Sequence, residues 1–232
     1  RDWSSDVCSS DLAPDIPAFS KAYLAMVDHP MSKGVSLTDA FSHGQLASKM
    51  WLVDELSKLD LNLGRVWTLC GWIGTLGYIM LARRNEIRFD DIRSFDIDPR
   101  CAPLADTLNR PNVMDGWKFK ATTMDVNEMS YDGFKYDTLK YDGTSQRMTE
   151  TADTVINTSC DHMGDNDVWF DRIPSGKVIV LQNNDWFEND QHNNSVNSIE
   201  EFRSRYPIKD LMYSGTIDCG TYKRFMMIGR KV

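Results

Sequence analysis

The chain has 232 residues, of which 41% are hydrophobic, and its formal charge at pH 7 is −8. A chain of this length buries most of its apolar surface within one domain, which excludes a small disulfide scaffold and a disordered tail. The acidic balance argues against general nucleic-acid binding, which depends on Lys and Arg at phosphates, and leaves open only a local basic patch.

Residues 1–12 (RDWSSDVCSSDL) do not resemble a protein segment. They match the translated end of a common sequencing-library adapter, so we interpret them as a non-native artefact and exclude them from the fold. We expect the natural chain to begin upstream of residue 13. Residues 13–60 are expected to form a helical lead or cap, and residues 61–232 an α/β domain.

Four cysteines remain, and they are widely spaced without a CxxC pair; they are Cys70, Cys101, Cys160 and Cys219. With no signal peptide in view, we expect reduced thiols in a cytoplasmic protein. The most apolar run, residues 66–81, contains three glycines and is shorter than the roughly 20 residues that cross a bilayer. A metal site from His162, His192, Cys160 and nearby aspartates is conceivable, but no ligand spacing supports it, so no metal is predicted. No feature predicts the oligomeric state.

Apolar runs alternate with helical patterns along the chain. After a proline-containing lead, residues 36–59 show helical spacing with a break near Gly44. A strand at 65–70 runs into a glycine turn and an apolar helix at 76–81. A strand at 93–97 and a helix at 102–108 follow, and 118–122 is a short third strand.

Residues 131–141 (YDGFKYDTLKY) repeat a Tyr-Asp step and interrupt this alternation. We interpret them as a surface excursion between the third and fourth strands. The segment is either an ordinary exposed loop or hairpin, or an aromatic wall over a ligand pocket.

The alternation resumes with a strand at 152–157, a short helix within 165–172 and a strand at 177–182. Ser198 begins a helix that extends to Tyr206. The last two strands, 211–217 and 223–228, are joined by a turn too short for a crossover, so they must pair antiparallel. The predicted fold is a doubly wound α/β fold with a mostly parallel seven-stranded sheet, a C-terminal antiparallel hairpin and N-terminal helices.

Ligands of such sheets bind beyond the carboxyl ends of the strands. Gly71 and Gly74 follow the first strand, where glycine lets the backbone approach a ligand, although tight helix packing explains them equally well. Their GxxGxxG spacing differs from the dinucleotide pattern GxGxxG. Asp96 ends the second strand, where a carboxylate accepts hydrogen bonds from ribose hydroxyls or merely caps the next helix.

The closing hairpin, the glycine turn and Asp96 together resemble the class I S-adenosylmethionine-dependent methyltransferases, over roughly residues 61–229. The resemblance implies S-adenosylmethionine as cofactor and methyl transfer as the reaction. It also implies a cofactor site in which the glycine turn approaches the methionine part, Asp96 holds the ribose and Asp125 contacts the adenine. The implied cofactor-binding residues are Gly71, Trp72, Gly74, Asp96, Ile97, Asp125, Val126 and Asn157.

In these enzymes the end of the fourth strand faces the acceptor, so the implied catalytic residues are Asn157, Asp161 and His162. The prolines and aromatic residue of amino-methylating nucleic-acid enzymes are missing after Asn157, which argues against a base amine as the acceptor. Histidine is a common general base near neutral pH, but His162 as a plain structural donor is an equal alternative. Cys160 is either a nucleophile or, more commonly, a packed small residue.

Two further polar segments could line the pocket or belong to ordinary loops. One comprises residues 182–187 and 192–194, and the other residues 42–45 with Ser48 and Lys49. The charge favours a small-molecule acceptor. Three alternatives remain: another S-adenosylmethionine-using enzyme such as an aminocarboxypropyl transferase or a lyase, a nicotinamide-dependent oxidoreductase, and a non-catalytic binding subunit of the same fold.

Overall fold

A computed structural model describes residues 16–164, 168–188, 190 and 192–232, so the interpretation of residues 1–12 lies outside the described residues. The first elements are α1 (Ile16–Val27), the 3-10 turn η1 (Pro30–Ser32), α2 (Leu37–Ala40) and α3 (His43–Lys58). The strands of the main sheet are β1 (Arg65–Leu69), β2 (Asp91–Asp96), β3 (Phe119–Thr123), β6 (Thr154–Asn157), β7 (Val178–Asn184), β8 (Ile208–Asp218) and β9 (Lys223–Lys231). The connecting helices are α4 (Thr75–Ala82), α5 (Cys101–Leu108), α6 (Arg110–Met114), α7 (Val168–Asp171) and α8 (Ile199–Arg205), with 3-10 turns η2 (Val126–Glu128) and η3 (Cys160–His162).

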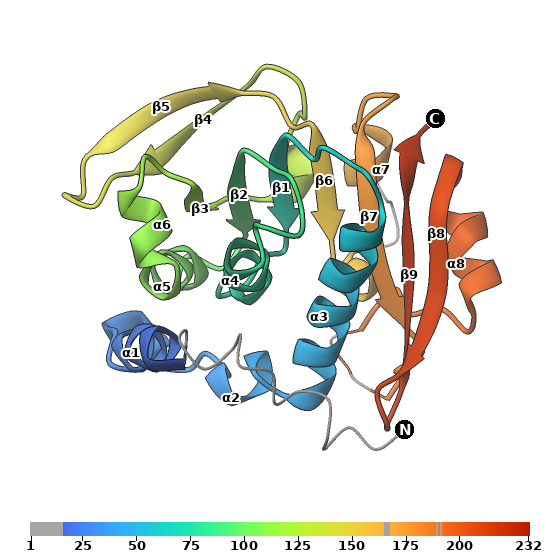
Figure 1. Ribbon diagram of the computed structural model, residues 1–232, viewed down its shortest axis with the longest axis horizontal. Coiled ribbons are helices and arrows are strands. Elements are labelled where there is room, and N and C mark those ends of the chain that lie inside the picture. The colour runs from blue at the N-terminus through green and yellow to red at the C-terminus, as the bar shows by residue number, and fades with distance from the viewer. Residues whose placement is uncertain (1–15, 165–167, 189, 191) are drawn as a thin grey trace.

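The main sheet has seven strands in the order β3-β2-β1-β6-β7-β9-β8. β1 pairs in parallel with β2 and β6, whereas β9 runs antiparallel to both β7 and β8. The predicted mostly parallel sheet with a closing antiparallel hairpin is confirmed. Strand order reverses beside β1, and it is at such a reversal that α/β sheets form a ligand crevice outside the carboxyl ends of their strands. The carboxyl ends of β1, β2 and β6 lie at the same edge of the sheet (Figure 1).

The sheet is covered on both faces, since nearly every residue of its central strands is buried. Val66 and Ile156 face a cluster formed with α3, α4 and α5, whereas Trp67 and Val155 face a second cluster formed with α7 and α8. Side chains on a strand point alternately to opposite faces, so an apolar residue at nearly every position requires both faces to be buried. The molecule is therefore a three-layer α/β/α structure.

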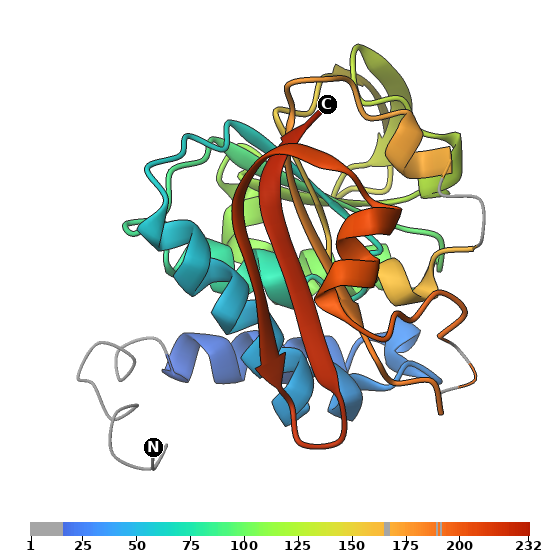
Figure 2. The ribbon, with the colours of Figure 1, turned by 90° about the vertical axis from the view of Figure 1, so that its right-hand side faces the viewer.

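The helices α1 and α2 lie across the carboxyl ends of the parallel strands (Figures 1 and 2). Phe19 and Tyr23 of α1 pack with Phe41 and Tyr78 in a small third cluster. The sequence predicted a helical lead here but did not give the bounds of α1. The break predicted near Gly44 lies just before that residue, between α2 and α3. This packing places α2 and the first turn of α3 over the crevice.

The Tyr-Asp segment forms a separate antiparallel hairpin of β4 (Phe134–Leu139) and β5 (Ser145–Glu150). Tyr131 and Tyr136 are buried in the cluster under α7, and Tyr141 is exposed beside Arg110. The aromatic-wall interpretation is wrong, because two of the three rings fill the core and the third lies on the surface. The hairpin reading is correct.

Among the described residues, we find no helix with the length and apolar character that a membrane crossing needs.

Candidate functional site

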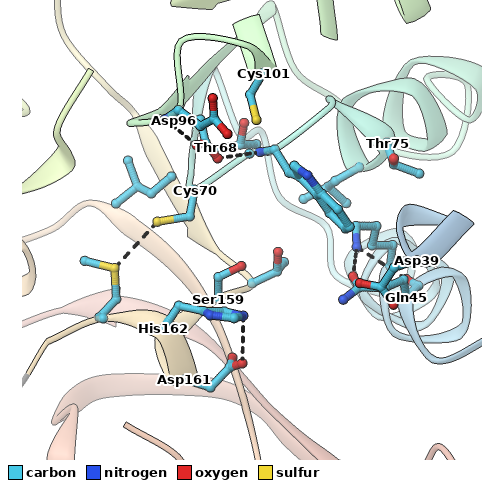
Figure 3. A pocket seen from close by; sticks show the side chains of 18 of the residues that line it. Asp39, Gln45, Thr68, Cys70, Thr75, Asp96, Cys101, Ser159, Asp161 and His162 are labelled. Carbon is cyan, nitrogen blue, oxygen red and sulfur yellow. Dashed lines mark hydrogen bonds and ion pairs between the residues drawn. The ribbon is translucent and has the colours of Figure 1, made fainter. Parts of the chain in front are cut away.

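A cavity of about 910 Å³ lies at the carboxyl ends of the parallel strands. Its walls come from the loops after β1, β2, β3, β6 and β7, from residues 34–49, and from the start of β9. Ligand cavities of folded proteins span roughly 300–1,000 Å³, so this one is large enough for two reactants. Figure 3 shows Asp96 on one side of the Cys70 turn and Asp161 with His162 on the other.

The turn after β1 has an unusual backbone. Cys70 (φ 50°) and Trp72 (φ 48°) both adopt left-handed conformations that glycine takes more easily. Gly71 between them has no room for a side chain, because a Cβ there would lie 2.1 Å from Ser94 Oγ. The turn thus brings backbone, rather than side chains, against the cavity at Gly71.

Gly74 does not line this cavity. It begins α4 with a left-handed φ of 76°, and a Cβ would lie within 3.0 Å of Ala105, Asn109 and Phe119. The geometry therefore favours the packing explanation for Gly74 over contact with a ligand.

Asp96 holds the turn and faces the cavity. One carboxylate oxygen accepts a hydrogen bond from Trp72 N (2.9 Å) and the other from Asp98 N (3.0 Å). Burial raises the pKa of Asp96, although these backbone donors partly oppose the shift. The Cys101 thiol is a third partner of this carboxylate. Two carboxylate oxygens offer about four lone-pair sites, so one site is left for a ligand hydroxyl.

Ile97 and Asp98 follow Asp96 on the same wall. The Ile97 side chain is 68% exposed, which makes it an open apolar surface at the cavity. Asp98 is held by Arg100 in a two-pronged ion pair, and this pair lowers its pKa. Of the two acids, Asp96 has the carboxylate not already engaged by a cation.

Asp125 and Val126 line the cavity beyond β3. Asp125 caps η2 by accepting a hydrogen bond from Asn127 N, and Val126 is largely buried. The preceding residue, Met124, donates its N–H to the Asp96 carbonyl, which ties this loop to the end of β2.

Asn157 lies under the cavity and does not line it. Its side-chain oxygen accepts a hydrogen bond from Ser159 N at 2.8 Å, and the residue is fully buried. This turn directs the following residues toward the cavity, so Asn157 is placed to shape the loop. Cys160 is also fully buried, and its thiol contacts the Asn157 carbonyl, which fits the packed-residue alternative.

Asp161 stands at the centre of a polar cluster. Its Oδ2 lies 3.4 Å from His162 Nε2 and 3.2 Å from His192 Nε2, while Oδ1 lies 3.3 Å from Arg224 Nη1. His192 and Arg224 are buried, whereas the His162 side chain is 39% exposed. Burial lowers the pKa of His192, against the opposing effect of Asp161.

The sequence named His162, His192 and nearby aspartates only as a conceivable metal site without supporting ligand spacing. It did not identify Arg224. The antiparallel pairing of Asn184 with Arg224 places the start of β9 at the carboxyl end of β7. The signal for Arg224 was a cation at the start of an otherwise apolar strand (RFMMI), where an unpaired buried charge is unfavourable.

Lys49 and Gln45 come from α3 to the same cavity. The Lys49 ammonium donates to the Gln45 side-chain oxygen and is buried, with 8% of the residue exposed. Burial lowers its pKa to about 7, and the nearby Arg224 contributes in the same direction. This end of the cavity therefore holds the buried Arg224 guanidinium and a buried lysine that is only partly protonated near neutral pH.

Neither a protein-family model nor a curated protein matches the sequence. Solved structures do match. The magnesium protoporphyrin IX methyltransferase of Synechocystis PCC 6803 with bound SAH is 11% identical, with a TM-score of 0.57 over 94% of this chain and 96% of that chain. The N-methyltransferase NodS of Bradyrhizobium japonicum, in complex with S-adenosyl-L-homocysteine (SAH), is 8% identical, with a TM-score of 0.56 over 91% and 98%.

A third match is an S-adenosylmethionine-dependent methyltransferase of Clostridium acetobutylicum, which is 10% identical with a TM-score of 0.53 over 84% of this chain and 94% of that chain. At these identities the likeness concerns the arrangement of the backbone. The chain has the class I methyltransferase fold.

Proposed function

We propose that the protein is an S-adenosylmethionine-dependent methyltransferase with a small-molecule acceptor. The observation that carries the proposal is Asp96, a carboxylate at the end of β2 that faces the cavity beside the tight turn after β1. The fold shared with methyltransferases supports it. The antiparallel β9 counts against a nicotinamide-dependent oxidoreductase, because the last strand of that fold is usually parallel.

The cavity wall suggests how the cofactor lies. Its methionine part is proposed to contact the backbone of the turn at Gly71 and Trp72, and a ribose hydroxyl to donate to Asp96. The exposed Ile97 side chain offers an apolar surface for the adenine ring. Asp125 and Val126 are proposed to contact the other edge of that ring.

The acceptor is proposed to lie near Asp161 and His162, on the other side of the Cys70 turn. The acceptor atom attacks the methyl carbon in line with the carbon–sulfur bond, whose electron pair stays on sulfur. The sulfonium is already activated, so the protein mainly aligns the two reactants and excludes water. Asp161 and His162 are proposed to deal with the proton that a hydroxyl or amine acceptor loses.

A small acceptor fits the wall of the cavity better than a polymer does. Residues 34–49 pass over the strand ends, and Lys49 and Arg224 are buried rather than spread along an exposed basic surface. Nucleic-acid binding depends on such exposed cations.

Titration calorimetry with S-adenosylmethionine and S-adenosylhomocysteine tests the proposal. We expect Asp96→Asn to weaken both ligands by about 10- to 100-fold, because a hydrogen bond to a charged group contributes about 1.5–3 kcal/mol. Asp98→Asn is the matched control, since that carboxylate is paired with Arg100, and it should change affinity by less than about threefold.

Absence of binding to the unsubstituted protein would contradict the function, whereas equal effects of the two substitutions would contradict the ribose assignment alone. Mass spectrometry of the products distinguishes methyl transfer, which leaves S-adenosylhomocysteine, from aminocarboxypropyl transfer, which leaves methylthioadenosine.

A further inference from the structure

Three potential metal ligands converge at the acceptor end of the cavity. Asp161, His162 and His192 each offer one ligand atom, and these atoms all lie within 4.8 Å of one another. Both histidines direct Nε2 toward the same oxygen, Asp161 Oδ2, at 3.4 Å and 3.2 Å. The rings themselves meet edge to face, with centroids 4.6 Å apart.

The two distances to Asp161 Oδ2 match those between ligands of one ion. With metal–ligand distances of about 2.0–2.2 Å, neighbouring ligands of a tetrahedral or octahedral ion lie about 2.8–3.6 Å apart. Both distances to Asp161 Oδ2 fall in that range. Two histidines and one carboxylate also form a common donor set of open, catalytic metal sites.

The surroundings of His192 point the same way. Its Nδ1 lies 3.1 Å from the Trp186 carbonyl oxygen, which only accepts, so Nδ1 must carry the hydrogen. With its hydrogen on Nδ1, a neutral His192 ring has the Nε2 lone pair available for an ion beside the Asp161 carboxylate. Such a backbone contact on the second nitrogen is how proteins orient histidines that bind metals.

Asp161 is oriented by a second partner in the same way. Arg224 Nη1 lies 3.3 Å from Oδ1 and leaves Oδ2 to the histidines. The carboxylate is buried, while His162 is partly exposed to the cavity. The cluster is therefore anchored on its buried side and open toward the cavity.

We propose that Asp161, His162 and His192 bind one divalent transition-metal ion at the acceptor end of the cavity. Nitrogen-rich donors select zinc, cobalt or iron(II) over magnesium and calcium, which prefer oxygen ligands. The positive charges of Arg224 and Lys49 further disfavour a weakly held ion, so only a metal with strong bonds to imidazole is retained.

The ion's role rests on the proposed function and narrows the acceptor to an oxygen nucleophile. A metal binds a hydroxyl through its oxygen and acidifies it, as it acidifies bound water. The hydroxyl proton passes to solvent, and the oxygen forms the new bond to the methyl carbon as the carbon–sulfur bond breaks with its pair on sulfur. His162 then acts as a metal ligand and not as the general base.

Cobalt(II) tests the site, because its visible absorption reports the ligand geometry. The full chain, stripped with EDTA and freed of chelator, is titrated with CoCl₂. We expect one equivalent to bind per chain and zinc to displace it. Asp161→Asn and His192→Ala should each weaken cobalt binding at least about 100-fold. Loss of a residue that only hydrogen-bonds to a metal ligand typically weakens binding by about 10- to 100-fold. His43→Ala, which changes another cavity histidine, should leave it unchanged.

Circular dichroism melts establish that each variant is folded, and a single-ligand variant, His162→Ala, provides a third measurement. Failure of the unsubstituted protein to bind cobalt or zinc stoichiometrically would overturn the site, as would cobalt binding that survives Asp161→Asn and His192→Ala. S-adenosylhomocysteine titrated into the metal-free protein separates the proposals. If the protein binds S-adenosylhomocysteine but not cobalt, the proposed function is supported and the metal site is contradicted. If it binds cobalt but not S-adenosylhomocysteine, the metal site is supported and the proposed function is contradicted.

Discussion

Lys49 shows how one buried charge shapes the cavity. The helix α3 places it among Arg224, which opposes its charge, and Asp39 and Asp161, which favour it. Burial outweighs the two acids and holds its pKa near 7. In the unfolded chain the pKa of a lysine is about 10.4, so folding lowers the pKa of Lys49.

This difference predicts a pH-dependent stability. Between about pH 7 and 10 the unfolded chain binds more protons at this residue, so its contribution to the free energy of unfolding rises with pH in that window. Below pH 7 Lys49 is protonated in the folded chain as well, and burying its charge lowers the free energy of unfolding. We therefore expect Lys49→Met to be more stable than the unsubstituted protein at pH 6, with a smaller advantage at pH 9, in urea unfolding.

Lys58→Met changes an exposed lysine of the same helix and serves as the control. The pKa of Lys58 is raised by the hydrogen bond to Glu55, so the stability difference of this variant should not vary between about pH 6 and pH 9. A constant difference for Lys49→Met as well would show that the folded chain does not depress this pKa.

Single residues of the candidate site also differ in how far their position can be predicted from the sequence. Asp96 was identifiable because an acid at the end of a parallel strand must lie at the carboxyl edge of the sheet, where ligands bind. Asn157 ends a strand too, but a hydrogen bond to the residue two positions on turns its side chain inward. The contact of Asp161 with His192 and Arg224 spans up to 63 positions, and no local pattern encodes it.

Among the elements, the junction of β1 and α4 is tightly packed around Gly74. Gly74→Ala would force a left-handed alanine against three side chains within 3.0 Å. We expect it to lower the free energy of unfolding by about 2–4 kcal/mol, the sum of the left-handed strain and overpacking. Gly116→Ala is the control, because Gly116 is also left-handed (φ 56°) with nothing within 4 Å, and it should cost about 1 kcal/mol. Urea unfolding measures both, and equal losses would exclude a packing role.

The β4–β5 hairpin is joined to the main sheet by a buried ion pair. Glu150 of β5 accepts two-pronged hydrogen bonds from Arg93 of β2, and Tyr136 donates to the same carboxylate. Glu150→Leu leaves the buried Arg93 guanidinium with Asp91, at 3.4 Å, as its remaining ion-pair partner, so we expect a loss of about 3 kcal/mol, the low end for a broken buried pair. Asp137→Asn breaks an exposed pair with Arg147 in the same hairpin and should cost less than about 1 kcal/mol. A loss below 1 kcal/mol for Glu150→Leu would mean that the ion pair does not anchor the hairpin.

The central strands β1, β6 and β7 were predictable because they carry apolar residues at successive positions, which face both sides of the sheet. The hairpin strands were not, because Thr138 and Glu150 occupy buried positions that the apolar-polar alternation assigns to hydrophobic residues. Only the tertiary partners, Thr122 and Arg93, make those polar residues stable in the interior.

At the scale of the whole molecule, the cavity is formed by parts of the chain that are distant in sequence. Residues 34–49 contribute one wall, and the strand ends contribute the rest. Bound S-adenosylhomocysteine should therefore slow amide hydrogen exchange in residues 36–49 and in the turn at 70–74. The β4–β5 hairpin does not line the cavity and is the internal control. Equal protection of the hairpin would indicate general stabilisation, and no protection at 36–49 would place the ligand elsewhere.

The position of β1 at the centre of the sheet has a consequence for synthesis. Val66 pairs on one side with Ile92 and on the other with Thr154, which is made 88 positions later. At about 5–20 residues per second, one hydrogen-bonding edge of β1 waits on the order of 5–20 s for its partner. During that interval the nascent chain exposes an apolar strand edge, so chaperone capture and aggregation compete with completion of the sheet.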